Sequence, residues 1–547
     1  MNFLRLHDFL LGVLFEDDEI IAIDKPYGIN SHTNESKVGN ADFIQDGLIE
    51  IFERQLGQRL YIVHRLDQTT TGVIIFAKTP IAAKKYAAFF FAREVKKTYW
   101  FVTASKSKAE DFVIDQSILH KAKDLQAKTV FHRLKKNSHF ELWQANPLTG
   151  RNHQIRIHAK AAEISILGDE KYGGAEYAFL CLHNHRIEFP NGVVIESQAP
   201  LFFEDLEILE NRLLAKALFE SDRRLRLFKS EQADQCFRLV HSKELGFTLD
   251  QLGRKLVLSC YSENWTAELF KTFTAYSQIL MKPIYVRMMH NRGKDPLNKS
   301  QLFISPNQNE LSESSWIAKE NTIQYEMRSD SGQSFGLFLD QRLQRNWVLG
   351  NAKGRSVLNL FSYTCGFSVA AALGGATQVT SVDTNKNVLN WGRKNFEVNN
   401  LDPANYRFLL RDSLDFLESS LKKNIKYDLI ICDPPSFSRN EKGVFKIETS
   451  LESLLSHCLQ CLNENGDLLF STNFEEFYID DIRKIILKVK ATLELKNLLI
   501  YNIHSALDFE LTGKAPILKS FLIKVRSKPI NEEIMKTEQV ISELDEN

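Results

Sequence analysis

The sequence predicts a multidomain protein, in which a β-rich α+β domain and a small α+β domain precede an α/β domain with a doubly wound parallel sheet. First, 547 residues are too many for one hydrophobic core. Second, short β-rich runs separated by loops continue to about Pro200. Third, strands, glycine-bearing turns and helices alternate from Ser356 onward, which is typical of a doubly wound sheet.

The composition favours a globular protein without membrane segments. Hydrophobic residues make up 44% and charged residues 25% of the chain, and no run approaches the roughly 18 uncharged apolar residues of a membrane span. The apolar run from Phe9 to Phe15 lacks a cleavage site for a signal peptide. The seven cysteines do not form a disulfide pattern, and Cys458 and Cys461 fit one apolar helix face better than a metal site. We therefore expect a cytoplasmic protein with reduced thiols and no metal.

The elements divide the chain into five expected regions. Residues 14 to 26 read as strand, turn and strand ending at Pro26, and open a first domain over 1–205. A helical connector is expected over 206–235, and a small α+β domain with RNA contacts over 236–310. A polar linker over 293–315 leads to the α/β domain at 316–528, whose strands include SVLNLF, QVTSVD, YRFLLRD, YDLIICD and GDLLFS. The last region, 529–547, holds six acids and one lysine and is expected to be disordered.

Charge gives one local signal. Lys plus Arg and Asp plus Glu both number 69, so the net charge does not indicate a nucleic-acid partner. Between Arg93 and Lys136, however, eleven basic residues face five acidic ones. We expect this basic run to contact phosphates, because catalytic motifs lie on either side of it.

The first motif is His64 to Gly72, HRLDQTTTG. It resembles the HRLDxxTSG signature of RluA-type pseudouridine synthases, with Thr71 in place of the usual Ser. The blocks KKTYW, TGRNHQIRIH, ILGDEKYGG and LCLHNHRIEF continue the resemblance in order over residues 10 to 200. The resemblance implies the pseudouridine synthase fold, with a mixed and mainly antiparallel sheet, and no external cofactor.

By this resemblance Asp67 is the catalytic carboxylate, acting on the sugar or on the ring of an everted uridine. Arg156 would keep that carboxylate ionised, because a nearby guanidinium favours the charged form. Tyr99 would stack on the uracil and serve in proton transfer, while Arg65 would hold the RNA backbone. His153 and His158 are expected as hydrogen-bonding framework, and Lys25, Pro26 and Gly28 as a strand-ending turn.

The second site follows from the segment SVLNLFSYTCGFSVAAALGGATQVTSVD. Its turn carries Phe361 and Gly366, where glycine permits close approach of the backbone to a cofactor. Asp383 at the end of the next strand can accept hydrogen bonds from two ribose hydroxyls, and Asp412 suits an adenine amine. This pattern alone fits NAD about as well as S-adenosylmethionine (SAM), although the GxGxxG form that binds a pyrophosphate is missing.

The segment CDPPSFS distinguishes these cofactors. Its two prolines, Pro434 and Pro435, fix the backbone at Asp433, and Phe437 offers a ring to a flipped base. Upstream, GLFLDQR resembles the GxFLDxR block of RlmI/RlmK-type ribosomal RNA methyltransferases, and the likeness extends over about 236 to 526. The resemblance implies a class I SAM-dependent methyltransferase with Asp340, Arg342 and Asp433 at the cofactor.

The methylated atom is expected to be guanine N7. Methylation of pyrimidine carbon-5 needs a cysteine nucleophile, and the block from Phe470 to Asn473 has none. Guanine N7 already presents a lone pair, and the DPPSFS and FSTN blocks resemble the N7 branch, with Asn473 at the substrate. An exocyclic amine is the alternative, because Asp433 could accept a hydrogen bond from it.

Together these motifs predict a bifunctional enzyme that forms pseudouridine and methylates a base in large-subunit ribosomal RNA. A ribosome-assembly factor with one active half is a rival, and transfer RNA is a second candidate substrate for the first domain. The modified positions, the order of the reactions and the oligomeric state stay open.

Overall fold

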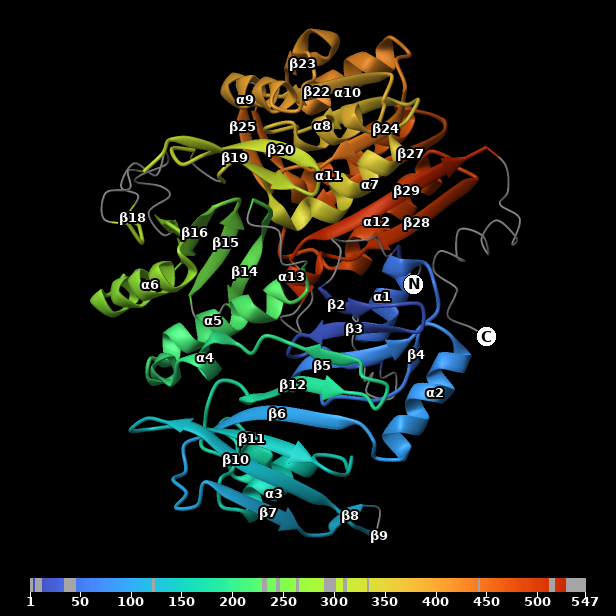
Figure 1. Ribbon diagram of the computed structural model, residues 1–547. Coiled ribbons are helices and arrows are strands. Elements are labelled where there is room, and N and C mark those ends of the chain that lie inside the picture. The colour runs from blue at the N-terminus through green and yellow to red at the C-terminus, as the bar shows by residue number, and fades with distance from the viewer. Residues whose placement is uncertain are drawn as a thin grey trace.

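The computed structural model describes residues 3–4, 12–33, 46–120, 123–228, 234–242, 246–261, 265–289, 302–307, 312–331, 334–440, 443–510 and 517–527. The expected acidic tail, 529–547, lies outside these residues. Three larger sheets organise the chain, with the first in the lower half of Figure 1, the third in the upper half and a smaller sheet at one side between them.

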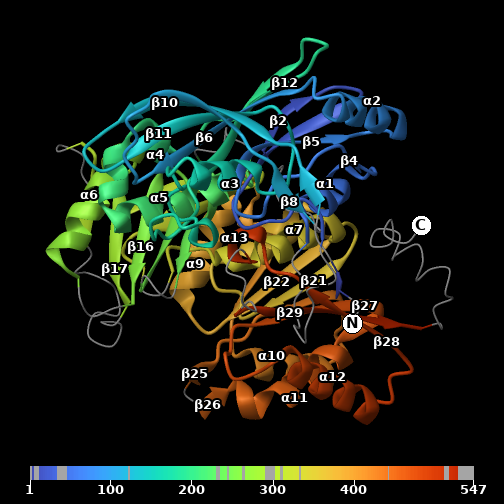
Figure 2. The same ribbon diagram turned by 90° about the horizontal axis from the view of Figure 1, so that it is seen from below.

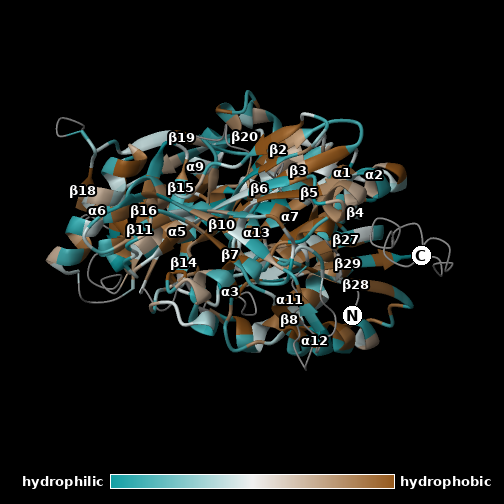
Figure 3. Ribbon diagram, turned by 60° about the horizontal axis from the view of Figure 1, so that its bottom comes forward, coloured by the Kyte–Doolittle hydropathy of each residue, from teal (hydrophilic) through white to brown (hydrophobic). Residues whose placement is uncertain are grey.

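The first sheet is the ten-stranded frame of the N-terminal part. Its order is β2-β3-β5-β12-β6-β11-β10-β7, with β4 and β13 attached to β5 and β12. All pairs are antiparallel except β5 with β12, so the expected mixed and mainly antiparallel fold is confirmed. Every residue of β5 is buried, which fits its apolar run in the middle of the sheet (Figure 3). The elements of this part are β2 (Val13–Glu16), β3 (Ile20–Lys25), α1 (Leu48–Leu56), β4 (Tyr61–Ile62), β5 (Thr71–Ala77), α2 (Pro80–Phe91), β6 (Lys96–Thr103), β7 (Asp111–Asp115), β8 (Ile118–His120), β9 (Lys123–Leu125), β10 (Lys128–Lys136), β11 (Glu141–Pro147), α3 (Gln154–Ala161), β12 (Leu182–Glu188) and β13 (Val194–Glu196).

The small sheet has five strands in sequence order. Its strands are β14 (Cys236–Ser242), β15 (Phe247–Leu252), β16 (Lys255–Cys260), β17 (Ile284–Met288) and β18 (Leu302–Ile304), and α6 (Ala267–Leu280) connects β16 to its parallel neighbour β17. All six residues of β16 are buried. The expectation of a linker over 293–315 was wrong at 302–304, because Leu302 to Ile304 pair with β17.

The third sheet has the expected doubly wound topology. Its order is β1-β28-β29-β27-β24-β21-β22-β23, and only β29 runs antiparallel to its neighbours. Strand order reverses between β21 and β24, and ligands of such sheets bind at the carboxyl ends of the strands on either side of that point. The strands of this sheet and the helices between them are β21 (Ser356–Leu360), α8 (Gly366–Leu373), β22 (Gln378–Asp383), α9 (Lys386–Glu397), β23 (Arg407–Leu410), α10 (Ser413–Lys422), β24 (Tyr427–Cys432), α11 (Ile447–Gln460), β27 (Leu462–Thr472), α12 (Ile479–Thr492), β28 (Asn497–Ile503), α13 (Leu507–Glu510) and β29 (Lys519–Arg526). They are preceded by β19 (Ser315–Glu320), β20 (Ile323–Arg328) and α7 (Arg342–Asn351). A hairpin of β25 (Phe437–Asn440) and β26 (Gly443–Lys446) follows β24.

One strand crosses the expected domain boundary. β1 (Phe3–Leu4) pairs in parallel with β28, so the start of the chain is part of the third sheet and not of the first. A two-residue strand has too few residues to show a periodic pattern, and its partner lies almost 500 residues away in sequence. The expectation that the first domain includes the chain from residue 1 was therefore wrong for residues 3–4.

The expected connector is part of a continuous core. α4 (Leu201–Glu204) and α5 (Arg212–Leu225) precede the small sheet, and buried α5 side chains such as Leu214 and Leu218 share one apolar cluster with residues of the first sheet and of the small sheet. Figure 2 shows α5 and α13 in the layer between the first sheet and the third sheet.

Asp508, whose carboxylate is buried, connects α5, the small sheet and helix α7, which precedes β21, through hydrogen bonds. Asp508 of α13 pairs with Arg342 of α7 at 2.7 and 3.1 Å and accepts from the Arg238 backbone at 2.8 Å. Its carbonyl oxygen accepts from Arg224 of α5 at 2.9 Å. Both side chains of the Arg342–Asp508 pair are completely buried. The expectation that Arg342 binds the cofactor is therefore contradicted, because its guanidinium is used inside the core.

Candidate functional sites

The first site forms where the loop before β5 meets the start of α3. Asp67 lies on that loop, and its Oδ2 is 3.5 Å from Arg156 Nη1 and 3.7 Å from His153 Nε2. The loop enters β5 at Gly72, whose φ is +104° and where a Cβ atom would lie 2.2 Å from the Asn184 carbonyl oxygen. Glycine is required there because the backbone of β12 passes so closely. The glycine of the sequence motif thus allows the end of this loop to lie directly against β12.

Arg156 is oriented by a carboxylate that the sequence analysis did not single out. Asp169 accepts from Arg156 Nε and Nη2, each at 2.7 Å, and the Asp169 side chain is completely buried. The Arg156 guanidinium also lies 5.0 Å from the ring centre of Tyr172. A two-point contact of this kind fixes the plane of the guanidinium, so Nη1 stays directed at Asp67. Asp169 belongs to the ILGDEKYGG block, whose acid and tyrosine were the available signal.

Tyr99 of β6 completes this group. Burial raises the pKa of the Tyr99 hydroxyl, and the negative charge of Asp67 raises it further. The phenol therefore stays neutral and able to donate a proton. Asp67, Arg156 and Tyr99 thus lie together, whereas Arg65 is exposed on the same loop, where solvent and RNA can reach it.

Lys25 has a larger part in this site than a strand-ending turn. Its ammonium group donates to the carbonyl oxygens of Gln68 at 3.0 Å and Thr70 at 2.9 Å, which follow Asp67 on the same loop. The Lys25 side chain is completely buried, and burial lowers the pKa of Lys25 to about 7, against the opposing effect of Asp67. Lys25 therefore holds the loop by its backbone.

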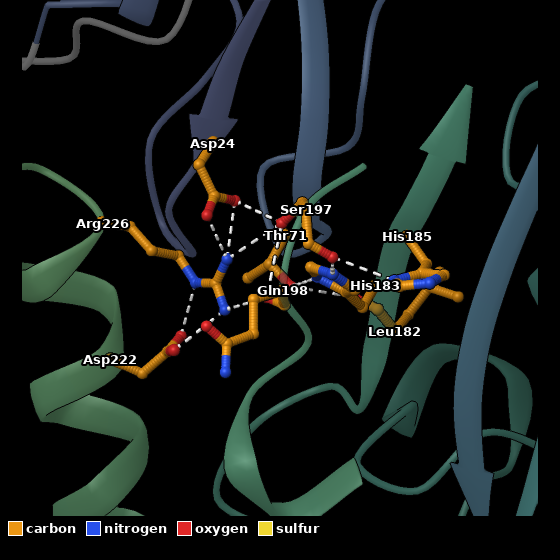
Figure 4. Close-up of polar contacts among 9 residues, drawn as sticks. All are labelled: Asp24, Thr71, Leu182, His183, His185, Ser197, Gln198, Asp222 and Arg226. Carbon is orange, nitrogen blue, oxygen red and sulfur yellow. Dashed lines mark hydrogen bonds and ion pairs between the residues drawn. The ribbon is translucent and has the colours of Figure 1, made fainter. Parts of the chain in front are cut away.

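A polar network connects the same loop to α5 (Figure 4). Thr71 Oγ1 lies 2.9 Å from His183 Nδ1, and His183 Nε2 lies 3.3 Å from the Ser197 carbonyl oxygen. Because a carbonyl oxygen only accepts, Nε2 carries the proton and Nδ1 accepts from Thr71. Arg226, which follows α5, donates to Ser197 Oγ at 3.1 Å and to both carboxylate oxygens of Asp24 at 2.6 Å. Arg226 is therefore connected to the loop in two ways. One runs through Ser197 and His183 to Thr71, and the other through Asp24, whose neighbour Lys25 donates to the loop backbone.

The second site begins at the turn between β21 and α8. Phe361, Tyr363 and Cys365 have φ angles of 53°, 47° and 62°, an arrangement that non-glycine residues adopt only under strain. Strained backbone of this kind gathers at ligand sites. The Tyr363 backbone donates to Asp383 Oδ2 at 2.9 Å, which ties the turn to the end of β22. At Gly366 a Cβ atom would lie 3.4 Å from Arg345 Cδ, which is an ordinary van der Waals contact, so the protein itself leaves room for a side chain there.

The acids at the strand ends suit a nucleoside. Burial raises the pKa of Asp383, whose Oδ1 accepts from the Asn385 backbone at 2.9 Å. Asp412 begins α10 as its N-cap and accepts from the backbones of Leu414 and Asp415 at 2.9 and 3.1 Å. Both carboxylates are therefore held in place while a ribose or an adenine amine could still approach them. Phe361, whose ring centre is 5.7 Å from that of Phe445, lies on the same turn.

Asp433 and Asp340 form a pair of acids at the end of β24. The pKa of Asp433 is raised to about 7, first by burial and then by the negative charge of Asp340. Arg345 and a hydrogen bond from Gln341 act in the opposite direction. Arg345 itself is buried and donates to both carboxylate oxygens of Glu320, at 2.7 and 2.5 Å. The sequence analysis chose Arg342 of the GLFLDQR block, whereas the guanidinium near the site comes one helical turn later.

The remaining expected residues lie on loops around this edge. Pro434 is buried, Pro435 and Asn473 are exposed, and the Phe437 side chain is 50% exposed at the start of β25. A ring this open can stack on a base. Cys432 is fully buried, and burial raises its pKa, so it is no nucleophile. Within the described residues, no group of three His, Cys, Asp or Glu side chains is arranged to hold a metal, and no helix is long and apolar enough to cross a membrane.

The basic run is less positive than its count suggests. Lys96 pairs with Glu188 at 2.7 Å and Arg133 with Glu141 at 3.3 Å, and both of these acids lie outside the run. Two of its charges are therefore partly offset by acids that the count does not include. Contacts of this run with phosphates stay a prediction.

Comparison with known proteins assigns both halves. Residues 19–161 match the RNA pseudouridylate synthase family, and residues 303–484 match the S-adenosylmethionine-dependent methyltransferase family. A ribosomal RNA large subunit methyltransferase K/L of Pseudoalteromonas translucida is 43% identical over 158 residues, or 28% of this chain and 22% of that protein. The protein of the same name from Psychrobacter cryohalolentis is 32% identical over 247 residues, or 42% of this chain and 30% of that protein. The chain thus spans less than a third of the length of these relatives.

A solved structure supports the C-terminal assignment. A candidate SAM-dependent methyltransferase of Streptococcus mutans is 26% identical and covers 61% of this chain and 86% of its own, with a TM-score of 0.50. The chain therefore joins a pseudouridine synthase domain to a class I methyltransferase domain.

Proposed function

We propose that this protein is a bifunctional RNA-modification enzyme, which isomerises uridine to pseudouridine and methylates guanine N7 in large-subunit ribosomal RNA with SAM. The single observation that supports the first activity best is Asp67 Oδ2 at 3.5 Å from an Arg156 Nη1 that Asp169 holds in place. The acids Asp383 and Asp433 around a strained turn support the second.

In the first reaction the bond between C1′ and N1 breaks, the uracil turns, and C1′ bonds to C5. The proton on C5 is lost and N1 gains one, so the product is an isomer and needs no cofactor. The Asp67 carboxylate would act on the sugar or the ring, and Arg156 would keep it ionised. Tyr99, neutral and half-buried beside Asp67, would stack on the base and exchange the proton.

In the second reaction SAM, when bound, supplies the methyl group. Asp383 would bind its ribose and Asp412 its adenine, while the strained turn that ends at Gly366 would bring its backbone to the cofactor. Phe437 would stack on the target base and Asn473 would contact it. Guanine N7 has a free lone pair, so alignment of the base with the methyl carbon is the main requirement.

One observation favours a second candidate, an exocyclic amine of guanine. An amine loses a proton when it is methylated, and a carboxylate with a pKa of about 7, as Asp433 has, could accept it near neutral pH. The two candidates therefore differ in the pH dependence that they predict for methylation.

Ribosomal RNA is the proposed substrate because the curated relatives are large-subunit ribosomal RNA methyltransferases. With that substrate the protein would act in the cytoplasm. Transfer RNA is a second candidate for the pseudouridine half, and the basic run from Arg93 to Lys136 would contact phosphates of either RNA.

The test is incubation of unmodified ribosomal RNA with the protein, with and without SAM, followed by mass-spectrometric mapping. Pseudouridine is expected without SAM and should disappear with Asp67→Ala. A methyl group is expected only with SAM and should disappear with Asp433→Ala. The exposed Asp330→Ala is the matched control and should leave both products unchanged. RNA that is bound but carries neither product would support the rival, an assembly factor without activity.

A further inference from the structure

A second concave surface adjoins the methyltransferase site. It is a cavity of about 180 Å³ between β15, β16 and β17 of the small sheet and the segment from Ser334 to Asp340. The side chains that matter for its chemistry are Arg238, Thr248, Asp250, Arg287, Phe338 and Asp340. None of the six was assigned to an RNA contact by the sequence motifs, and only Asp340 belongs to the cofactor residues expected above.

The cavity contains a polar group that the protein leaves unsatisfied. Only 7% of Thr248 is exposed, and its hydroxyl has no hydrogen-bond partner among the described residues. A buried hydroxyl without a partner costs free energy that a bound ligand can recover. Thr248 therefore indicates a ligand with at least one hydrogen-bonding edge.

The charges of the cavity are balanced. Arg238 is held by Asp250 through two hydrogen bonds of 2.7 and 3.1 Å, and the Arg287 guanidinium lies 5.0 Å from the Phe335 ring centre. Asp340 is the second carboxylate. A bare anion such as phosphate would meet two carboxylates here, whereas a neutral ring with both donors and acceptors would satisfy both kinds of group.

One residue of the cavity wall also belongs to the methyltransferase site. Asp340 lines the cavity together with Arg238, and its charge acts on Asp433 at the end of β24. The exposed Phe338, next to Leu339 and Asp340, contributes an aromatic face. A flat ligand in the cavity would therefore have one edge near the DPPSF loop.

We propose that this cavity, with Thr248, Arg287, Asp250 and Asp340, receives the everted guanine that accepts the methyl group. Guanine groups its acceptors O6 and N7 on one edge and its N1 and N2 donors on another, which matches guanidinium and carboxylate partners. The proposal rests on the proposed methyltransferase function and places part of the substrate site on the small sheet.

The experiment uses the full-length protein saturated with S-adenosylhomocysteine, so that the cofactor site is filled. Saturation-transfer NMR titrations with GMP and CMP should show GMP binding at least tenfold tighter, and inorganic phosphate should not displace it. Thr248→Val keeps the size of the side chain and should weaken GMP at least tenfold, as should Arg287→Met. Arg254→Met, an exposed residue of the same sheet, is the charge-matched control and should bind like the wild type.

Equal binding of GMP and CMP would overturn the proposal, as would displacement of GMP by phosphate or by S-adenosylhomocysteine. So would wild-type GMP affinity in Thr248→Val. An affinity for S-adenosylhomocysteine that matches the wild type shows that each variant is folded. If the wild type methylates guanine in RNA and Thr248→Val does so with unchanged kcat and KM, only the cavity assignment fails. If the wild type binds GMP as expected but methylates no guanine, only the proposed function fails.

Discussion

Asp433→Asn tests whether the pair of acids at the methyltransferase site is real. The pKa of this carboxyl rises from 3.8 to about 7 in the folded protein. Its folded-state pKa is above the unfolded one, so its contribution to stability is complete below about pH 4 and is lost as the pH rises through about 7. The difference between these two pKa values corresponds to about 4 kcal/mol at most. Because Asp433 is only partly buried, we expect about 1–2 kcal/mol.

Asparagine is neutral at every pH and therefore avoids this loss. The Tm of Asp433→Asn should be close to that of the wild type at pH 4 and exceed it by about 2–8 °C at pH 8, for a methyltransferase part of about 200 residues. Differential scanning calorimetry at both pH values measures this, with the exposed Asp330→Asn as control. A difference between variant and wild type that is the same at pH 4 and pH 8 would refute the reasoning. Methylation kinetics extend the test: if the target is an amine, kcat should rise through about pH 7, whereas N7 methylation should not depend on this titration.

Three further predictions concern the packing around the two sites. Asp508→Ala leaves the buried Arg342 without its carboxylate and should lower the free energy of unfolding by about 3–5 kcal/mol. Denaturant titrations measure this, and the exposed Asp330→Ala should show no change. Arg226→Lys keeps the charge but loses the fork that joins Asp222 to Asp24 and Ser197. The kcat for pseudouridine formation should therefore fall about 10- to 100-fold while methylation persists, and Arg212→Lys on the exposed side of α5 should change neither. Lys25→Met removes the donors to Gln68 and Thr70 and should speed amide hydrogen exchange in residues 67–71, a result that a purely electrostatic role for Lys25 would not produce.

The sequence predicted those site residues that stand inside contiguous motifs. Asp67, Tyr99 and Arg156 come from three separate blocks and lie together, because the loop before β5, the strand β6 and the first turn of α3 meet at one place on the first sheet. Asp383 and Asp433 were predictable because the carboxyl ends of neighbouring parallel strands meet at one edge.

Partners that depend on tertiary packing could not be predicted in this way. Asp169 acts through Arg156, and nothing in local spacing says which acid a given arginine will meet. Arg342 and Arg345 lie one helical turn apart on α7, yet one pairs with Asp508 in the core and the other lies near Asp433. Which face of α7 is turned to the site follows from the position of α13, whose partner contacts come from three different parts of the chain.

The shared core predicts that the two halves do not fold well apart. α5 lies C-terminal to the region that matches the pseudouridylate synthase family, and its Leu214 and Leu218 belong to the apolar cluster that also contains Phe237 and Leu249 of the small sheet. A chain cut after residue 228 would expose this apolar surface and leave Arg224 without the Leu239 and Asp508 carbonyl oxygens. We expect residues 1–228 to aggregate when produced alone and to become soluble, with pseudouridine synthase activity, when residues 229–547 are co-expressed. The four substitutions Leu214, Leu218, Phe237 and Leu249 to Ser in the separate fragments should abolish this rescue. A soluble and fully active 1–228 fragment on its own would show that α5 completes the first domain without the small sheet.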